Sequence, residues 1–173
     1  MSTKNLSVFR FTLAVSLASS LALLLHSTSA LSAASPPPGS IAVASRGTNG
    51  CLTAEAGTIN ANGTAVLVSV CNGAENQVWD RPGDGTVRNR QSGRCLDADP
   101  ATSGQTTAPA RLWDCSGQPN QKWTLPAPGQ LNLIRNQLDG RCLAASPNGS
   151  INGAQLWTIC RTGTPYNEAW GLF

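Results

Sequence analysis

The 173-residue chain has few of the side chains that carry out catalysis or bind metal ions. It contains one histidine, His26, and only 12% of its residues are charged. It contains no Cys-x-x-Cys pair. Without a histidine after residue 26, the remaining chain cannot build a Ser-His or Cys-His catalytic pair, or a zinc site that includes histidine. We therefore predict no catalytic residues, no metal and no cofactor.

The beginning of the chain has the pattern of a secretory signal peptide. Basic residues precede an apolar run at residues 11–25, and small residues follow it up to Ala30. The apolar run is short for a membrane span. The predicted organisation is a signal peptide at 1–30, a proline-rich leader at 31–40 and one domain at 41–173. We expect a secreted, extracellular protein with no membrane span after cleavage.

The charge of the remaining chain does not indicate a nucleic-acid partner. Once residues 1–30 are removed, 10 basic residues face 9 acidic ones. The basic residues are scattered, and no run of lysine and arginine is interleaved with aromatic residues, as nucleic-acid binding would require. We predict no nucleic-acid binding.

One segment occurs three times in the chain. Each copy begins with Cys-Leu, has a second cysteine 18 to 20 residues later, and then has a four-residue box that ends in tryptophan. The copies are 44 and 47 residues apart. The marker residues are the first cysteines Cys51, Cys95 and Cys142, the second cysteines Cys71, Cys115 and Cys160, and the tryptophans Trp79, Trp123 and Trp170. A fixed period of this size indicates a repeat architecture, and three copies suggest a closed three-fold object.

The segments between the markers predict strands and disulfides. Helical periodicity is absent, and short apolar or alternating runs lie between Asn-Gly, Asp-Gly and Ser-Gly turn signals. This pattern favours an all-β barrel or sandwich. Six cysteines on a secreted chain indicate disulfides, and the repeat selects one bridge within each copy among the many pairings that are open. The predicted bridges are Cys51–Cys71, Cys95–Cys115 and Cys142–Cys160.

These motifs resemble those of the ricin B-type lectin domain. The Cys-Leu-Asp at Cys95, the Trp-x-Cys at Trp113 and the Asn-Gln-x-Trp boxes carry the resemblance, which covers about residues 41–173. It implies a single all-β β-trefoil of three pseudo-equivalent lobes, at about 41–84, 85–130 and 131–173. It implies twelve strands, six of which form a barrel closed at one end by three hairpins. It also implies that the three box tryptophans are mainly core residues.

The resemblance also implies the position of a sugar site. Ricin B-type lectins use the aspartate of Cys-Leu-Asp, the aromatic residue before the second cysteine and the asparagine of the box. The middle copy has all of these, as Asp97, Trp113, Asn120 and the adjacent Gln121. An aromatic face with convergent carboxylate and amide groups suits a sugar ring and its hydroxyls. We predict one complete site here, with Asp97 as a hydroxyl acceptor whose replacement by alanine leaves the fold intact.

The first and third copies are incomplete. Thr53 and Ala144 replace the aspartate, and no aromatic residue directly precedes the second cysteine of the first copy. Trp157 lies three residues before its cysteine rather than two, so its side chain is expected to face the opposite way unless a bulge compensates. Tyr166 and Asn167 are an alternative pocket in the third lobe.

The resemblance implies a non-enzymatic lectin. Its expected partners are glycans or glycoproteins with terminal galactose or N-acetylgalactosamine. The alternative is a trefoil inhibitor or protein-interaction module that has lost most sugar binding. A glycosidase would need two carboxylates held across a cleft, whereas paired carboxylates on a small trefoil surface are more often solvated. Two Asn-x-Ser/Thr sequons make Asn62 and Asn148 candidate N-glycosylation sites.

Overall fold

The computed structural model describes residues 38–45, 48–145, 154–157, 160 and 169–173. All of them belong to one compact unit, Ser32–Phe173. The predicted signal peptide lies outside the described residues. In the part of the chain that the structure describes, no helix is long and apolar enough to cross a membrane.

The described residues form thirteen strands and four short 3-10 helices. The first lobe holds β1 (Ile41–Ser45), β2 (Thr48–Ala54), η1 (Ala56–Thr58), β3 (Val66–Val70), η2 (Glu75–Gln77) and β4 (Trp79–Asp80). The second holds β5 (Arg88–Asn89), β6 (Cys95–Ala98), η3 (Pro100–Thr102), β7 (Thr107–Trp113), η4 (Pro119–Gln121) and β8 (Trp123–Thr124). The third holds β9 (Leu131–Asn132), β10 (Arg135–Asn136), β11 (Cys142–Ala145), β12 (Ala154–Trp157) and β13 (Trp170–Leu172).

The strand count exceeds the expected twelve by one because the first strand of the third lobe is divided. Its first part, β9, pairs with β13, and its second part, β10, pairs with β8 and β11. Two residues, Leu133 and Ile134, separate the two parts. If β9 and β10 are taken together, each lobe has four strands.

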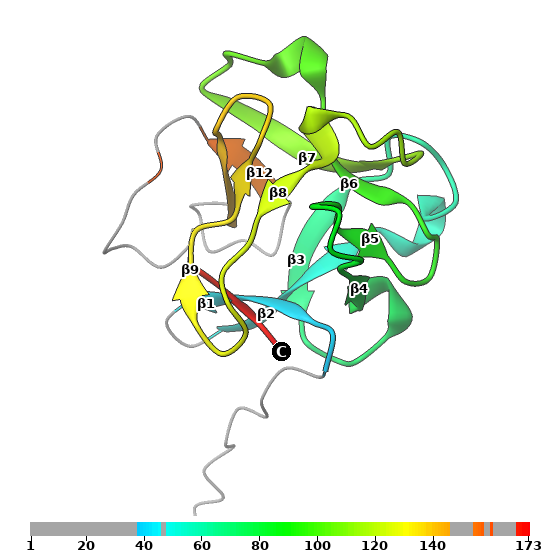
Figure 1. Cartoon of the computed structure of the whole chain (residues 1–173). Helices are drawn as coiled ribbons and strands as arrows, with labels where there is room; N and C mark the ends of the chain where they lie inside the picture. Colours follow the sequence, from blue (N-terminus) through cyan, green and yellow to red (C-terminus); the bar gives the residue numbers. More distant parts are fainter. Residues whose placement is uncertain (1–37, 46–47, 146–153, 158–159, 161–168) are drawn as a thin grey trace, which may run out of the picture. The chain divides into compact units, whose positions relative to one another are not determined.

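Antiparallel pairing joins the strands into two sheets. One has the order β3-β2-β1-β13-β9, and the other has the order β4-β5-β6-β7-β12-β11-β10-β8. Figure 1 shows the red C-terminal strand β13 beside β1, so the first and last strands of the domain pair with each other. In the second sheet β7 pairs with β12, which joins the middle lobe to the third lobe. The pairing therefore closes the domain on itself.

The three box tryptophans occupy equivalent positions in the core. They are 0 to 2% exposed. Each indole Nε1 donates a hydrogen bond to the carbonyl of the leucine that follows the first cysteine of its lobe. These bonds are Trp79 to Leu52 at 2.9 Å, Trp123 to Leu96 at 3.0 Å and Trp170 to Leu143 at 2.8 Å. One contact repeated three times shows that the sequence repeat is also a structural repeat.

Three disulfides join the pairs Cys51–Cys71, Cys95–Cys115 and Cys142–Cys160, each inside one lobe. In each lobe the first cysteine lies on the second strand (β2, β6 or β11), and the second cysteine lies in the segment that follows the third strand (β3, β7 or β12). The bridged cysteines are 18 to 20 residues apart, which corresponds to roughly 3 kcal/mol of stabilisation per bridge in the chain-entropy model. The bridges therefore hold the hairpin of each lobe closed.

The glutamine of the first box holds the turn after the disulfide. The Oε1 of Gln77 accepts from the backbone N–H of Asn72 at 2.8 Å, and its Nε2 donates to the carbonyl of Val70 at 2.9 Å. The side chain is 1% exposed. Because a buried amide must have its hydrogen bonds satisfied, this pair of contacts fixes the turn and the box together.

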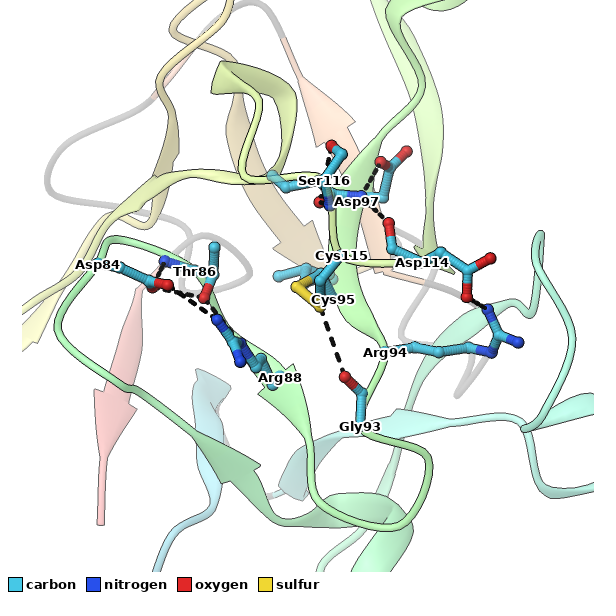
Figure 2. The surroundings of a disulfide bond; sticks show 12 residues. Asp84, Thr86, Arg88, Gly93, Arg94, Cys95, Asp97, Asp114, Cys115 and Ser116 are labelled. Atoms are coloured by element: carbon cyan, nitrogen blue, oxygen red, sulfur yellow. Dashed lines mark hydrogen bonds and ion pairs between the residues drawn. A yellow bond between two sulfur atoms is a disulfide. The ribbon is translucent and has the colours of Figure 1, made fainter.

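A carboxylate organises the turn that leads into the middle lobe. The backbone N–H and the hydroxyl of Thr86 donate to Asp84 at 2.9 and 2.6 Å, and Arg88 donates to it at 2.9 Å (Figure 2). The hydroxyl hydrogen bond from Thr86 is the main cause that lowers the pKa of Asp84. This turn precedes β5 and β6, and β6 carries Asp97.

Candidate functional site

The predicted sugar-binding residues lie on β6, β7 and η4 of the middle lobe. In the β6–β7 pair Cys95 lies opposite Trp113, and Asp97 lies opposite Arg111. Along β7, Arg111 and Trp113 belong to the more exposed face, whereas the alternate residues Ala108, Ala110 and Leu112 lie in the core. Because directly opposite residues of an antiparallel pair share a face, Asp97, Arg111 and Trp113 lie on one side of the hairpin.

Asp97 is the centre of this cluster and is 1% exposed. Its Oδ1 accepts from Arg111 Nε at 2.9 Å. Its Oδ2 accepts from Asn120 Nδ2 at 2.8 Å and from Gln121 Nε2 at 2.9 Å. The structure therefore brings three of the predicted site residues, Asp97, Asn120 and Gln121, into direct contact. Because this carboxylate is buried and accepts from three donors, the structure does not favour the expectation that alanine in its place leaves the fold intact.

Trp113 supplies the exposed aromatic surface of the cluster. Its residue exposure is 37%, in contrast to the buried box tryptophans. The central carbon of the Arg111 guanidinium lies 4.1 Å from the centre of the indole ring. A guanidinium at this distance is attracted to the negative face of the indole. One face of the predicted platform therefore carries a cation in this structure.

Arg111 is the residue that sequence reasoning missed. Besides its contact with Asp97, its Nη1 pairs with Asp99 Oδ2 at 2.5 Å. The signal was present in the sequence: Arg111 precedes Trp113 by two residues in a strand, so both belong to the same face. Asp99 follows Asp97 by the same interval. The residues that hold the carboxylate are therefore one arginine and two amides.

The two box residues contribute differently. Asn120 is 8% exposed and contacts Asp97 through its Nδ2. Gln121 is 1% exposed, its Nε2 also donates to the Asp114 carbonyl at 2.9 Å, and its Oε1 accepts from the Ser116 N–H at 2.7 Å. Gln121 therefore repeats the turn-holding contacts of the first box and positions Asp97. A direct sugar contact by Gln121 stays a prediction.

The end of β7 is held by a polar cluster that includes a candidate glycosylation site. Figure 2 shows Arg94 and Asp114 pointing toward each other, and the two form an ion pair. Asn62, from the first lobe, donates to Asp114 Oδ2 at 2.8 Å and accepts from the Asp114 N–H at 2.7 Å. The Asn62 amide thus links two lobes beside Trp113. The other candidate, Asn148, lies outside the described residues.

The first lobe has hydroxyl groups where the middle lobe has its carboxylate and indole. Thr53 is 6% exposed, and its Oγ1 lies 2.6 Å from Ser69 Oγ. Gln77 Nε2 donates to the same Thr53 hydroxyl at 3.1 Å. Cys51 lies opposite Ser69, so Ser69 occupies the register position of Trp113. This lobe therefore lacks both the charged acceptor and the aromatic platform.

The third lobe differs from expectation in its register. Cys142 lies opposite Trp157, just as Cys95 lies opposite Trp113. The expectation that the longer spacing moves Trp157 out of the register position of Trp113 is therefore wrong. The additional residue falls after β12, between Trp157 and the second cysteine of the lobe, and so does not shift the strand. Ala144 still replaces the aspartate, and Tyr166 and Asn167 lie outside the described residues.

Among the residues whose placement the structure gives, no group of three or more histidine, cysteine, aspartate or glutamate side chains is arranged to hold a metal ion.

Most of this chain matches the model of a known protein family. The model of the ricin-type beta-trefoil lectin domain matches residues 39–168. The chain belongs to this family. The match confirms the family and the β-trefoil fold that the resemblance implies, and membership implies carbohydrate binding.

Solved structures of ricin-type and related trefoils share the fold. The designed three-fold symmetric protein ThreeFoil is 25% identical with a TM-score of 0.64, and the match covers 76% of this chain and 94% of ThreeFoil. The agglutinin of Abrus precatorius is 21% identical with a TM-score of 0.60, over 78% of this chain and 47% of the agglutinin. The C-terminal half of an earthworm R-type lectin, solved with GalNAc, is 17% identical with a TM-score of 0.55, and the match covers 76% of this chain and 96% of the lectin half. Comparison with curated proteins finds no match.

Proposed function

We propose that the chain is a secreted, non-enzymatic lectin that binds galactose-type sugars through one complete site in its middle lobe. The observation that carries this proposal is the convergence of Asp97, Asn120 and the exposed indole of Trp113 on one hairpin and its adjoining turn. Neither Thr53 nor Ala144 offers a carboxylate at the equivalent position.

The chemistry of these groups suits a sugar. The indole of Trp113 offers an apolar face to the C–H surface of a pyranose ring. The carboxylate of Asp97 accepts from hydroxyls, and the amide of Asn120 donates and accepts. The Asn120 and Gln121 contacts fix the Asp97 carboxylate before any ligand arrives, which lowers the entropy cost of binding.

The galactose-type preference is supported by related trefoils. The earthworm lectin half was solved with GalNAc, and the β-trefoil lectin of the Vibrio vulnificus hemolysin was solved with N-acetyl-D-lactosamine. We therefore propose glycans or glycoproteins that end in galactose or N-acetylgalactosamine as partners of this chain.

The test is retention on immobilised galactose. Trp113→Ala removes the exposed platform and should weaken sugar binding at least roughly tenfold, because aromatic anchors dominate such small contact surfaces. Phe173→Ala is the matched control, since Phe173 is also an exposed aromatic residue, at 43%. We expect the parent and Phe173→Ala to be retained and Trp113→Ala to elute early. Equal retention of all three would contradict a middle-lobe site.

A second candidate function is a protein-interaction or inhibitor module. It is favoured by the position of Arg111, which covers the indole of Trp113 and contacts Asp97 where a sugar would bind. Capture of a protein that free galactose does not compete away would support this alternative. Capture that galactose abolishes would support the lectin.

A further inference from the structure

The side chain of Arg111 makes the same kinds of contact that a bound sugar would make. Its Nε donates to Asp97 Oδ1 at 2.9 Å, as a sugar hydroxyl would. Its guanidinium lies over the Trp113 ring at 4.1 Å, as the C–H face of a pyranose would. A sugar ring and this arginine cannot occupy the same face of the indole at once, because both would fill the volume above it.

We propose that Arg111 is an intramolecular competitor of the sugar, and that the affinity of the middle lobe is set by how readily its guanidinium leaves Trp113. This inference rests on the proposed function. Binding then exchanges one set of contacts for another. The sugar hydroxyl replaces the Arg111 Nε at Asp97, and the ring replaces the guanidinium on Trp113.

Two carboxylates hold Arg111 in the closed position. Asp97 and Asp99 both pair with it, and their side chains are 2% and 28% exposed. Asp99 is fixed in turn, because it caps η3 by accepting from the Ala101 N–H at 3.0 Å. The Arg111 side chain is itself 21% exposed, so part of it already faces solvent and has a route outward.

This arrangement differs from an ordinary surface ion pair. In the Arg90–Asp80 pair both side chains are 50% exposed, and solvent screens such a pair strongly. The Arg111–Asp97 pair is largely excluded from solvent, and it is therefore screened less. The ion pair thus stabilises the position of the Arg111 guanidinium over Trp113, and a neutral sugar must displace this guanidinium in order to bind.

Displacement of Arg111 leaves the Asp97 carboxylate already in place to accept a sugar hydroxyl. When Arg111 moves away, Asn120 and Gln121 still hold Asp97 Oδ2. Oδ1 then becomes available to a hydroxyl without movement of the carboxylate. The measured dissociation constant equals the intrinsic constant divided by the fraction of molecules in which Arg111 has moved.

Competition by an ion pair predicts an unusual salt dependence. A neutral sugar carries no charge, so its direct contacts give little reason for an effect of NaCl. Salt acts little on the closed pair itself, but it stabilises the separated charges that the open state exposes to solvent, and so it raises the fraction of open sites. Galactose should therefore bind the parent more tightly as NaCl rises from about 0.05 M to about 0.5 M, a range over which the screening length falls severalfold.

The decisive variant is Arg111→Gln. Glutamine is neutral and shorter, but it keeps an N–H donor for Asp97. We expect Arg111→Gln to bind galactose roughly tenfold more tightly than the parent at low salt, as for a closed fraction of about nine in ten. Its affinity should not change with NaCl. Arg90→Gln is the control, because it makes the same change of charge at an exposed pair and should bind like the parent.

The outcomes separate this inference from the proposed function. If Arg111→Gln binds no tighter, or more weakly, while Trp113→Ala loses binding, the competitor role is overturned and the lectin site stands. If neither the parent nor folded Arg111→Gln binds any sugar on a glycan array, both proposals fail. If Arg111→Gln does not fold, salt titration of the parent decides, and an affinity that is constant or falls with NaCl overturns the inference.

Discussion

Trp123→Ala is expected to lower the free energy of unfolding by about 3–5 kcal/mol, as for other buried tryptophans. Trp123 is 2% exposed and belongs to the hydrophobic core. Its removal leaves a cavity and also leaves the Leu96 carbonyl without the 3.0 Å hydrogen bond that it accepts. Because unfolded molecules have no sugar site, sugar binding should fall in proportion to the loss of folded protein.

Urea unfolding of Trp123→Ala and Trp113→Ala gives a direct comparison. Trp113 is 37% exposed, so its removal should cost much less stability than removal of Trp123. Equal losses of stability in the two variants would contradict the assignment of one tryptophan to the core and the other to the sugar platform.

Asp97→Ala is expected to lower the free energy of unfolding by about 3–5 kcal/mol, because it breaks a buried ion pair. The change leaves the Arg111 Nε and the side-chain amides of Asn120 and Gln121 without the carboxylate to which they donate, while Arg111 Nη1 keeps its pair with Asp99. Asp80→Ala is the matched control, since it removes the carboxylate of an exposed ion pair worth about 0–1 kcal/mol. Thermal or urea unfolding measures both variants.

This result would correct the expectation drawn from the sequence, in which Asp97→Ala leaves the fold intact. Loss of sugar binding by Asp97→Ala is informative only at temperatures where the variant remains folded. Unchanged stability would contradict the burial and the three contacts of Asp97. Trp113→Ala is therefore the cleaner test of sugar binding.

The repeat made the fold predictable. Trp79, Trp123 and Trp170 follow their paired cysteines in each copy, and this combination specifies both the lobe and its disulfide. Periodic features can be recognised from the sequence because the same residues recur at the same spacing in all three copies. The repeat predicts a closed three-fold, all-β object, and the family match confirms the β-trefoil that the resemblance implies.

Arg111 could not be found in this way because it is not part of the repeat. At the same register position the first lobe has Leu67 and the third has Gln155. A comparison of the three copies therefore does not identify Arg111 as a site residue. Only the pairing of β6 with β7 places it opposite Asp97.

Trp157 shows a second limit of residue counting. Its distance from the following cysteine suggested a reversed side chain, but alternation along a strand holds only within the strand. The additional residue lies beyond β12, so Trp157 keeps the register position of Trp113. Insertions after a strand and within it look alike in the sequence and have different structural consequences.

The most direct test of a single middle-lobe sugar site is a galactose titration followed by the indole N–H signals in a ¹H–¹⁵N spectrum. The chain has five tryptophans, and Trp113→Phe assigns the signal of Trp113. We predict that this signal shifts and saturates with galactose. The signals of Trp79, Trp123 and Trp170 should stay in place, since each of these indoles already donates to a leucine carbonyl in the core. A shift of the Trp157 signal with Trp113 unchanged, or no shift at any galactose concentration, would contradict the middle-lobe site.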